Sequence, residues 1–178
     1  DGLQSTADQH GAAIVVGVPT FGRSMPRISA LVFRPELKVL VYSKQHLHKD
    51  EMPFFEPGPE SNGVIHEDPV AALAICYELS VPAHARKAVD SGATVYLASV
   101  AKTARGVDDA CRRLSAIARE HSIVVMMANC LGLLDDAQCT GGSSAWSRNG
   151  KCLMQLDCAN EGILVLNCQT EDVLAAVR

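Results

Sequence analysis

The most constraining part of the sequence is the run Val70–Cys76, which is apolar at all seven positions (Val-Ala-Ala-Leu-Ala-Ile-Cys). A run of this length without polar alternation is typical of a strand that is covered on both faces. A helix is predicted shortly afterwards over Pro82–Ser91, because Pro82 stands near its start and Gly92 just beyond its end. The sequence therefore predicts that Cys76 lies at the end of a buried strand, close to the N-terminus of a helix.

The remaining elements mix hairpins with strand–helix–strand units, which indicates layers of sheet covered by helices. Strands are predicted over the apolar runs Ala12–Val18, Arg27–Phe33, Leu37–Ser43, Ala93–Val100 and Ile123–Ala128. Helical spacing covers residues 107–121, with Asp108 and Asp109 expected in the first turn of that helix. One turn is predicted at Arg34-Pro35-Glu36. A second turn, at Arg148-Asn149-Gly150, separates the segments Ser143–Ser147 and Lys151–Leu156, which Gly162–Asn167 follows. The Pro- and Gly-rich stretch Met52–Gly63 is predicted to be a loop.

Composition narrows the classes of protein to consider. The chain has 178 residues, 48% apolar and 20% charged, which suits one ordinary domain covering 1–178. The net charge is −4, and Lys and Arg are scattered, which argues against a nucleic-acid partner. Apolar runs such as Ile123–Ala128 are too short to cross a membrane, and no signal peptide is expected.

The chain contains seven cysteines, an odd number, and no pair has C-x-x-C spacing. This pattern predicts neither a zinc ribbon nor a thioredoxin-type site, and a reducing cytoplasm is the simplest compartment. The sequence suggests no metal and no cofactor.

Cys76 is the first candidate for chemistry. Backbone N–H groups in a strand-to-helix turn can stabilise an oxyanion, and the local positive potential lowers the pKa of a thiol. The alternative interpretation is a buried cysteine that acts as a small hydrophobic residue.

Lys44 and Glu51 are the next candidates. A Lys beside a catalytic thiol could stabilise a tetrahedral oxyanion, and a carboxylate could position that Lys or move protons. Two solvated surface charges are the alternative. A metal site at His46 and His48 is rejected because further ligands are not placed nearby, whereas a Cys–His hydrolase using Cys76 stays open.

Read together, several segments resemble the motifs of the nitrilase superfamily of carbon–nitrogen hydrolases. Tyr42–Leu47, with Glu51 seven residues after Lys44 and Phe54–Gly58 following, is similar to the lysine motif of that superfamily. Ala74–Pro82 is similar to its cysteine motif. The order of the remaining matching segments also agrees: Ile14–Gly17 with Pro19, Gly92-Ala93, Ala128-Asn129 with Gly132, Gly141–Ser144 and Asn149-Gly150. The resemblance covers nearly the whole chain.

The resemblance implies a four-layer α-β-β-α sandwich, which usually dimerises, and a Glu-Lys-Cys triad. Cys76 would attack the carbonyl or nitrile carbon, and Lys44 with the backbone N–H of Tyr77 would stabilise the oxyanion. Glu51 would be a second glutamate that orients Lys44. The implied reaction is hydrolysis of a small linear amide, an ω-amide or an N-carbamoyl compound through a Cys76 thioester, with nitriles less favoured.

The chain departs from the family pattern at several positions. The base Glu belongs to a Pro-Glu pair ahead of Ala12–Val18 and is not in this sequence, so the sandwich is expected to be incomplete at its N-terminal side. Asp1–His10 is similar to the end of the helix that follows the pair. Ser80, Ala83 and His121 also differ from common relatives, which affects the expected substrate pocket. A catalytically incomplete relative that acts as a binding or assembly module is therefore the alternative function.

Overall fold

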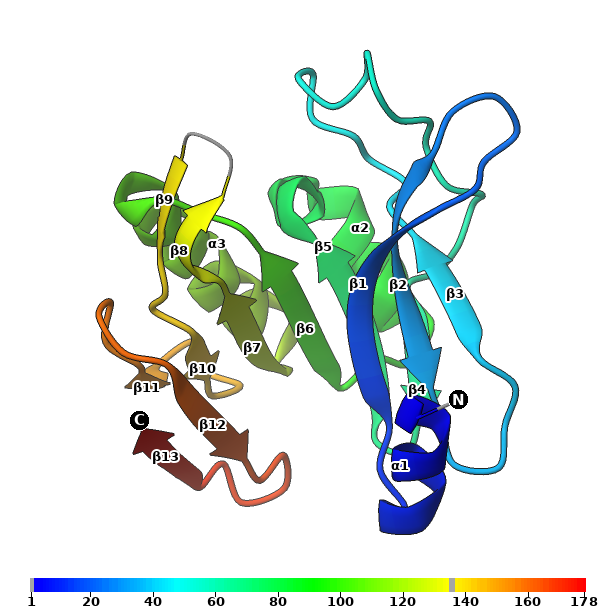
Figure 1. The fold of residues 1–178 in the computed structure, drawn as a ribbon. Coiled ribbons are helices and arrows are strands. Elements are labelled where there is room, and N and C mark those ends of the chain that lie inside the picture. Colours follow the sequence, from blue (N-terminus) through cyan, green and yellow to red (C-terminus); the bar gives the residue numbers. More distant parts are fainter. Residues whose placement is uncertain (1, 135–136) are drawn as a thin grey trace.

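The computed structural model describes residues 2–134 and 137–178. Its centre is a six-stranded sheet in the order β11-β10-β7-β6-β5-β4 (Figure 1). The parallel strands β5, β6 and β7 lie in the middle, and the antiparallel strands lie outside them. The strand bounds are β4 Val64–Glu67, β5 Val70–Ile75, β6 Val95–Val100, β7 Val124–Asn129, β10 Ser144–Trp146 and β11 Cys152–Gln155.

Helices cover one face of this sheet. They are α2 (Pro82–Asp90) and α3 (Ala104–His121). The apolar side of α3 includes Leu114 and packs with Tyr96 and Trp146 from the sheet into the largest core cluster. Because the other face is also covered, the residues Ala71–Ala74 of β5 are buried in succession, as the unbroken apolar run predicts.

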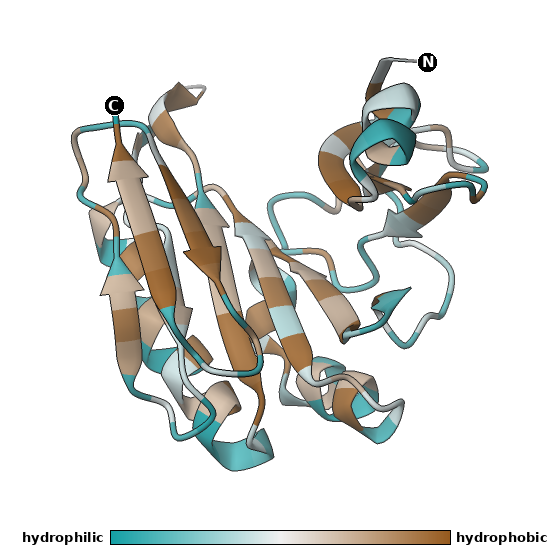
Figure 2. Ribbon diagram, turned by 90° about the horizontal axis from the view of Figure 1, so that it is seen from below, coloured by the Kyte–Doolittle hydropathy of each residue, from teal (hydrophilic) through white to brown (hydrophobic). Residues whose placement is uncertain are grey.

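A second antiparallel sheet, β1-β2-β3, lies on the opposite face of the six-stranded sheet (Figure 1). Its strands are β1 (Ile14–Thr20), β2 (Arg27–Phe33) and β3 (Leu40–Ser43). Val32 and Tyr42 pack against Leu73 between the two sheets. Helix α1 (Gly2–His10) lies outside β1–β3, so the layers follow the order helix, sheet, sheet, helix (Figure 2).

Two further hairpins complete the fold. The pair β12 (Gly162–Leu166) and β13 (Val173–Val177) lies on the same face of the six-stranded sheet as β1–β3. The pair β8 (Leu131–Leu134) and β9 (Ala137–Thr140) follows β7. The β1 edge that faces away from β2 and the β12 edge that faces away from β13 pair with no other strand among the residues described.

The predicted mixed α/β fold is confirmed, with corrections at element boundaries. Strand β5 ends at Ile75, and Cys76 opens a 3₁₀ turn, Cys76–Ser80, instead of closing the strand. Helix α3 starts at Ala104, so Asp108 and Asp109 lie beyond its first turn. Strand β3 starts at Leu40 because the preceding turn holds Arg34–Leu37, with Leu37 N–H donating to the Arg34 carbonyl.

Other predicted segments can be placed directly. Helix α1 covers nearly all of the predicted Asp1–His10, and Asp1 itself lies outside the described residues. Met52–Gly63 is loop, as predicted. In the described part of the chain, no helix is both long and apolar enough to cross a membrane.

Glu56 ties two of the loops together. Its carboxylate accepts the backbone N–H groups of Arg23 (2.7 Å) and Ser24 (3.1 Å), and it pairs with the Arg27 guanidinium at 2.6 Å. Gly22 is required here because a Cβ atom would collide with the Met25 carbonyl and with the Glu56 carboxylate. The backbone donors, with Arg27, hold the pKa of Glu56 at about 2. The Glu56 carboxylate thus joins the β1–β2 connection to the loop after β3.

Truncating the main core should cost stability. Leu114 is fully buried in the largest core cluster. We expect Leu114→Ala to lower the free energy of unfolding by about 3 kcal/mol, since it removes buried methyl groups and leaves a cavity. The matched control Leu133→Ala, at a 75% exposed position, should stay within about 0.5 kcal/mol of the wild type in urea unfolding. Equal losses in the two variants would contradict this description of the core.

The Glu56 contacts should depend on pH. The folded pKa is about 2, below the unfolded value of about 4.5, so the stabilisation is present above pH 4.5 and is lost as the pH falls toward 2. We expect Glu56→Gln to lower Tm at pH 6 and to lower it much less at pH 3, as measured by circular dichroism. A Tm difference that is the same at both pH values would be inconsistent with this pairing.

Candidate active site

Cys76 lies at a sharp bend between β5 and the 3₁₀ turn that leads to α2. Its backbone φ is +48°, a left-handed conformation that non-glycine residues rarely adopt. The bend is held by the side chain of Glu78, which accepts the Ile75 N–H at 2.8 Å. Cys76 is half-buried, beyond the carboxyl end of a parallel strand, where side chains from loops commonly form a site. Backbone strain at such a position is found mostly where surrounding contacts enforce it for function.

Lys44 lies directly after β3 and is fully buried, including its amino group. Its Nζ contacts both carboxylate oxygens of Glu51, at 2.5 and 2.6 Å. The main chain of Lys44 is fixed as well, because its N–H donates to the Ile28 carbonyl and its carbonyl accepts the Gly58 N–H. The structure therefore brings Lys44 and Glu51 together as a pair with a buried ammonium. The alternative interpretation, two solvated surface charges, is wrong for Lys44.

Glu51 is oriented by the loop that carries it. Its Oε2 accepts the His48 N–H at 2.7 Å, and its side chain is 24% exposed. A buried ammonium needs a counter-charge, and a carboxylate bound through both oxygens supplies it. The pair fixes the Lys44 amino group and leaves one side of Glu51 open toward solvent.

Tyr77, the residue after Cys76, turns its side chain away from the buried network. The ring is 37% exposed and packs edge-on against the His48 ring, with centroids 5.2 Å apart. The ring of His46 instead faces His84, at 6.1 Å. His46 and His48 therefore have different neighbours, although they alternate in the sequence.

Glu78 is an important residue to which the sequence patterns assigned no role. Its carboxylate is fully buried and accepts the backbone N–H of Gln45 at 2.7 Å and the Tyr42 hydroxyl at 2.8 Å, in addition to the Ile75 N–H. Glu78 stands inside the cysteine motif, and a charged residue between apolar neighbours was the available signal. Its contacts link the segment of Lys44 to that of Cys76.

His84 and Tyr96 extend this buried network. His84 Nε2 lies 2.9 Å from the Tyr42 hydroxyl, and Nδ1 lies 2.8 Å from the Tyr96 hydroxyl. Burial lowers the pKa of His84, although the nearby Glu78 charge opposes this effect. Burial also raises the pKa values of Tyr42 and Tyr96 above their ordinary range. These shifts favour the neutral forms of His84, Tyr42 and Tyr96.

Asn129, the last residue of β7, ties the loop after β6 to the turn after β9. Its amide accepts the Lys102 N–H at 2.8 Å and donates to the carbonyls of Lys102 (3.1 Å) and Gly141 (2.6 Å). The Gly141–Gly142 pair, with φ of +59° and +74°, makes the close backbone approach possible. The Gly141–Gly142 stretch is therefore a tight backbone turn closed by Asn129.

Cys130 and Cys139 are neighbouring thiols, and the Cys76 thiol acts electrostatically on Cys139. Cys130 follows β7, and Cys139 lies in β9. Burial, the neighbouring Cys130 thiol and, to a smaller extent, Cys76 raise the pKa of Cys139 to about 11. The β8–β9 hairpin thus borders the candidate site.

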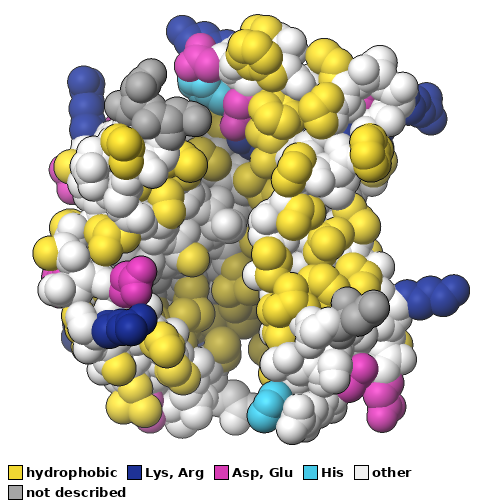
Figure 3. Space-filling view, viewed as in Figure 1, with side chains coloured by type: hydrophobic (Ala, Val, Ile, Leu, Met, Phe, Trp, Pro, Cys, Tyr) yellow, Lys and Arg dark blue, Asp and Glu magenta, His cyan; other side chains and the backbone are white. Residues whose placement is uncertain are grey.

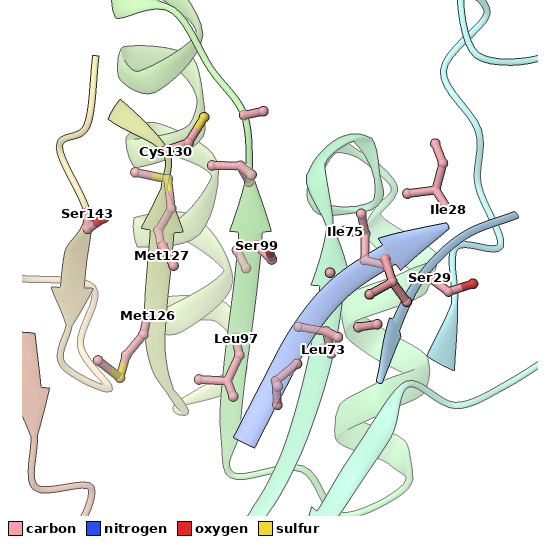
Figure 4. Close-up of a pocket in the computed structure, with 18 of the residues that line it drawn as sticks. Ile28, Ser29, Leu73, Ile75, Leu97, Ser99, Met126, Met127, Cys130 and Ser143 are labelled. Carbon is pink, nitrogen blue, oxygen red and sulfur yellow. The ribbon is translucent and has the colours of Figure 1, made fainter. Parts of the chain in front are cut away.

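A large apolar groove opens beside these residues. Its volume is about 970 Å³, and it lies between β1 and β12 over β5, β6 and β7. Figure 3 shows a hollow with hydrophobic side chains on its floor, and Figure 4 shows Leu73, Leu97 and Met126 at its base. Ile75, next to Cys76, and Phe55 line it, whereas Cys76, Lys44 and Glu51 do not. The groove therefore adjoins the candidate catalytic residues without containing them.

The comparisons with known proteins agree with this geometry. The family model for carbon–nitrogen hydrolases matches residues 1–177. An (R)-stereoselective amidase from a Pseudomonas species is 27% identical over 154 residues, which cover 86% of this chain and 56% of the amidase. The chain thus spans a little over half the length of that relative.

Solved structures give the same result. A nitrilase-superfamily amidase from Nesterenkonia, in a variant with an altered cysteine, matches with a TM-score of 0.78 at 26% identity, covering 88% of this chain and 62% of the amidase. Another form of that amidase shows acrylamide added to its active-site cysteine. A carbon–nitrogen hydrolase from Helicobacter pylori matches in fold with a TM-score of 0.79 at 18% identity, covering 98% of this chain and 64% of the hydrolase.

The fold, the match over almost the whole chain and these relatives lead to one conclusion. The chain belongs to the carbon–nitrogen hydrolase family, within the nitrilase superfamily.

Proposed function

We propose that the protein hydrolyses the C–N bond of a small amide, with Cys76 as nucleophile. The observation that carries the proposal is the fully buried Lys44, paired with Glu51 and followed by Gln45, whose N–H shares the Glu78 carboxylate with the N–H of Ile75 at the bend before Cys76. The amidases among the relatives support an amide over a nitrile, and linear amides, ω-amides and N-carbamoyl compounds are the substrate classes proposed.

In the proposed reaction, the Cys76 sulfur attacks the carbonyl carbon and forms a tetrahedral intermediate. The Lys44 ammonium and the backbone N–H of Tyr77 stabilise its negative oxygen. The intermediate collapses to a thioester on Cys76 while the amine leaves with a proton. Water then attacks the thioester, which releases the acid and restores the thiol.

The reaction needs a general base in addition to these groups. Glu51 is engaged with Lys44, and Glu78 accepts several backbone and hydroxyl donors, so neither carboxylate is free to take the proton. We propose that the base is the family glutamate, carried on a segment beyond these 178 residues that lies in the groove between β1 and β12. The apolar floor of the groove supports this assignment, as do the edges of β1 and β12 beside it, which pair with no further strand within residues 2–134 and 137–178.

The engagement of Glu51 and Glu78 in other contacts, which leaves neither as a base, also supports the second candidate function. Without the base, the chain would be a catalytically incomplete relative that acts as a binding or assembly module. Hydrolysis of any amide that depends on Cys76 would exclude this candidate. Assembly into a homodimer and a cytoplasmic location are further predictions from the sequence.

Replacing the nucleophile tests the proposal directly. We expect Cys76→Ala in the full-length protein to lower kcat/KM for aliphatic amides by ~10⁴-fold or more, since removing a nucleophile leaves only binding and oxyanion stabilisation. Ammonia release is the measurement, and Cys152→Ala, at an exposed thiol, is the matched control and should keep wild-type turnover. Full ammonia release by the Cys76 variant would refute the proposal.

Replacing Lys44 distinguishes the proposed mechanism from that of a Cys–His hydrolase. We expect Lys44→Ala to lower kcat by ~10²–10³-fold, the usual effect of losing an oxyanion donor. The exposed Lys87→Ala is the control, because its partner Glu60 is 88% exposed and lies on the surface. Unchanged turnover after loss of Lys44 would favour the Cys–His mechanism, which has no role for this residue.

A further inference from the structure

The carboxylate of Glu78 lies between the two segments that carry the proposed catalytic residues. Its Oε1 accepts the Gln45 N–H at 2.7 Å and, more weakly, the His46 N–H at 3.4 Å. Its Oε2 accepts the Ile75 N–H and the Tyr42 hydroxyl, both at 2.8 Å. Both oxygens therefore act as acceptors in these contacts.

Two of these donors lie next to the proposed catalytic residues in the sequence. Gln45 directly follows Lys44, and Ile75 directly precedes Cys76. Lys44 follows β3 of the three-stranded sheet, whereas Cys76 follows β5 of the six-stranded sheet. One fully buried side chain thus joins the backbone beside Lys44 to the backbone beside Cys76, across the interface between two sheets.

The hydrogen bonds behind Glu78 have a defined direction. The Tyr42 hydroxyl donates its proton to the Glu78 carboxylate, so it must accept a proton from His84 Nε2, 2.9 Å away. His84 Nδ1 then lacks a proton and accepts from the Tyr96 hydroxyl at 2.8 Å. The chain runs from Tyr96 through His84 and Tyr42 to Glu78, which fixes the orientation of the carboxylate from behind.

We propose that Glu78 is a positioning residue that sets the location of the Lys44 amino group relative to the Cys76 sulfur. This inference rests on the proposed function, because it assigns the partner groups of that same site. Glu78 contacts no reacting atom in the proposed mechanism. It acts through the main chain of Gln45 and Ile75 and through the strained bend at Cys76.

A glutamine in place of Glu78 has nearly the same shape but only one accepting oxygen. Its amide nitrogen would face either the Gln45 N–H or the Ile75 N–H with the Tyr42 hydroxyl, so donor would meet donor. One of the two segments would then move away from the other. A displacement of about 1 Å at a catalytic group can lower turnover by ~100-fold.

The test compares Glu78→Gln with the wild type and with Glu60→Gln, a matched change at a surface ion pair. Folded protein is first isolated by size-exclusion chromatography and checked by circular dichroism, and its sites are then counted by iodoacetamide labelling of Cys76 and mass spectrometry. We expect kcat per labelled site to fall by ~100-fold in Glu78→Gln with little change in KM, and to stay at the wild-type value in Glu60→Gln. A purely structural role would lower the number of sites but leave kcat per site unchanged, and that result would overturn the proposal.

A second variant covers failure of Glu78→Gln to fold. Tyr42→Phe removes only the hydroxyl that donates to the same carboxylate. We expect kcat per site to fall by about tenfold, because the carboxylate loses one of its orienting bonds. Wild-type kcat in this variant would overturn the proposal.

The outcomes also separate this inference from the proposed function. If the wild type turns over no amide, the proposed function fails, and the labelling rate of Cys76 then decides the role of Glu78. We expect that rate to fall by about tenfold in folded Glu78→Gln, since the bend at Cys76 loses the acceptor for the Ile75 N–H. An unchanged labelling rate would overturn the role assigned to Glu78.

Discussion

The buried ammonium of Lys44 is the interaction on which the rest of the site depends. A charge fully removed from water is strongly destabilising unless an opposite charge and hydrogen bonds compensate for it. Glu51 supplies that charge through both oxygens, and the His48 N–H orients Glu51 in turn. The loop after β3 must therefore fold back over Lys44, and Gly58, whose N–H binds the Lys44 carbonyl, closes the other side. A lysine held in this way is a fixed positive charge that is already in position before an oxyanion forms.

The remaining parts of the site are arranged around this lysine by the two sheets. The parallel strands β5, β6 and β7 end at the same edge, and there the chain forms the strained bend at Cys76 and the loops that Asn129 ties together. Helices α2 and α3 cover one face and leave the other free to receive β1–β3 (Figure 2). Glu78 connects the two sheets next to Lys44 and Cys76, so the packing of the layers and the geometry of the site depend on each other.

Much of this arrangement could be predicted from the sequence, and the limits have physical causes. The unbroken apolar run before Cys76 predicts a strand buried on both faces, and the structure has it in the parallel centre of the sheet. Short strands such as β4 and β13 were missed because four or five residues give little periodicity. Spacing could place Lys44 and Cys76 at strand ends but could not pair them, since pairing depends on how the two sheets pack. The link through Glu78 was missed for the same reason.

The mass of the Cys76 peptide during turnover tests the proposed nucleophile most directly. Trypsin releases residues 50–86 as one peptide, in which Cys76 is the single cysteine. The full-length protein would be mixed with a slowly hydrolysed amide, quenched in acid and digested. If Cys76 is the nucleophile, this peptide gains the mass of the acyl group and loses it on treatment with hydroxylamine, as a thioester does. Ammonia release with this peptide unmodified, or with the acyl group on another cysteine, would contradict the role of Cys76 as nucleophile.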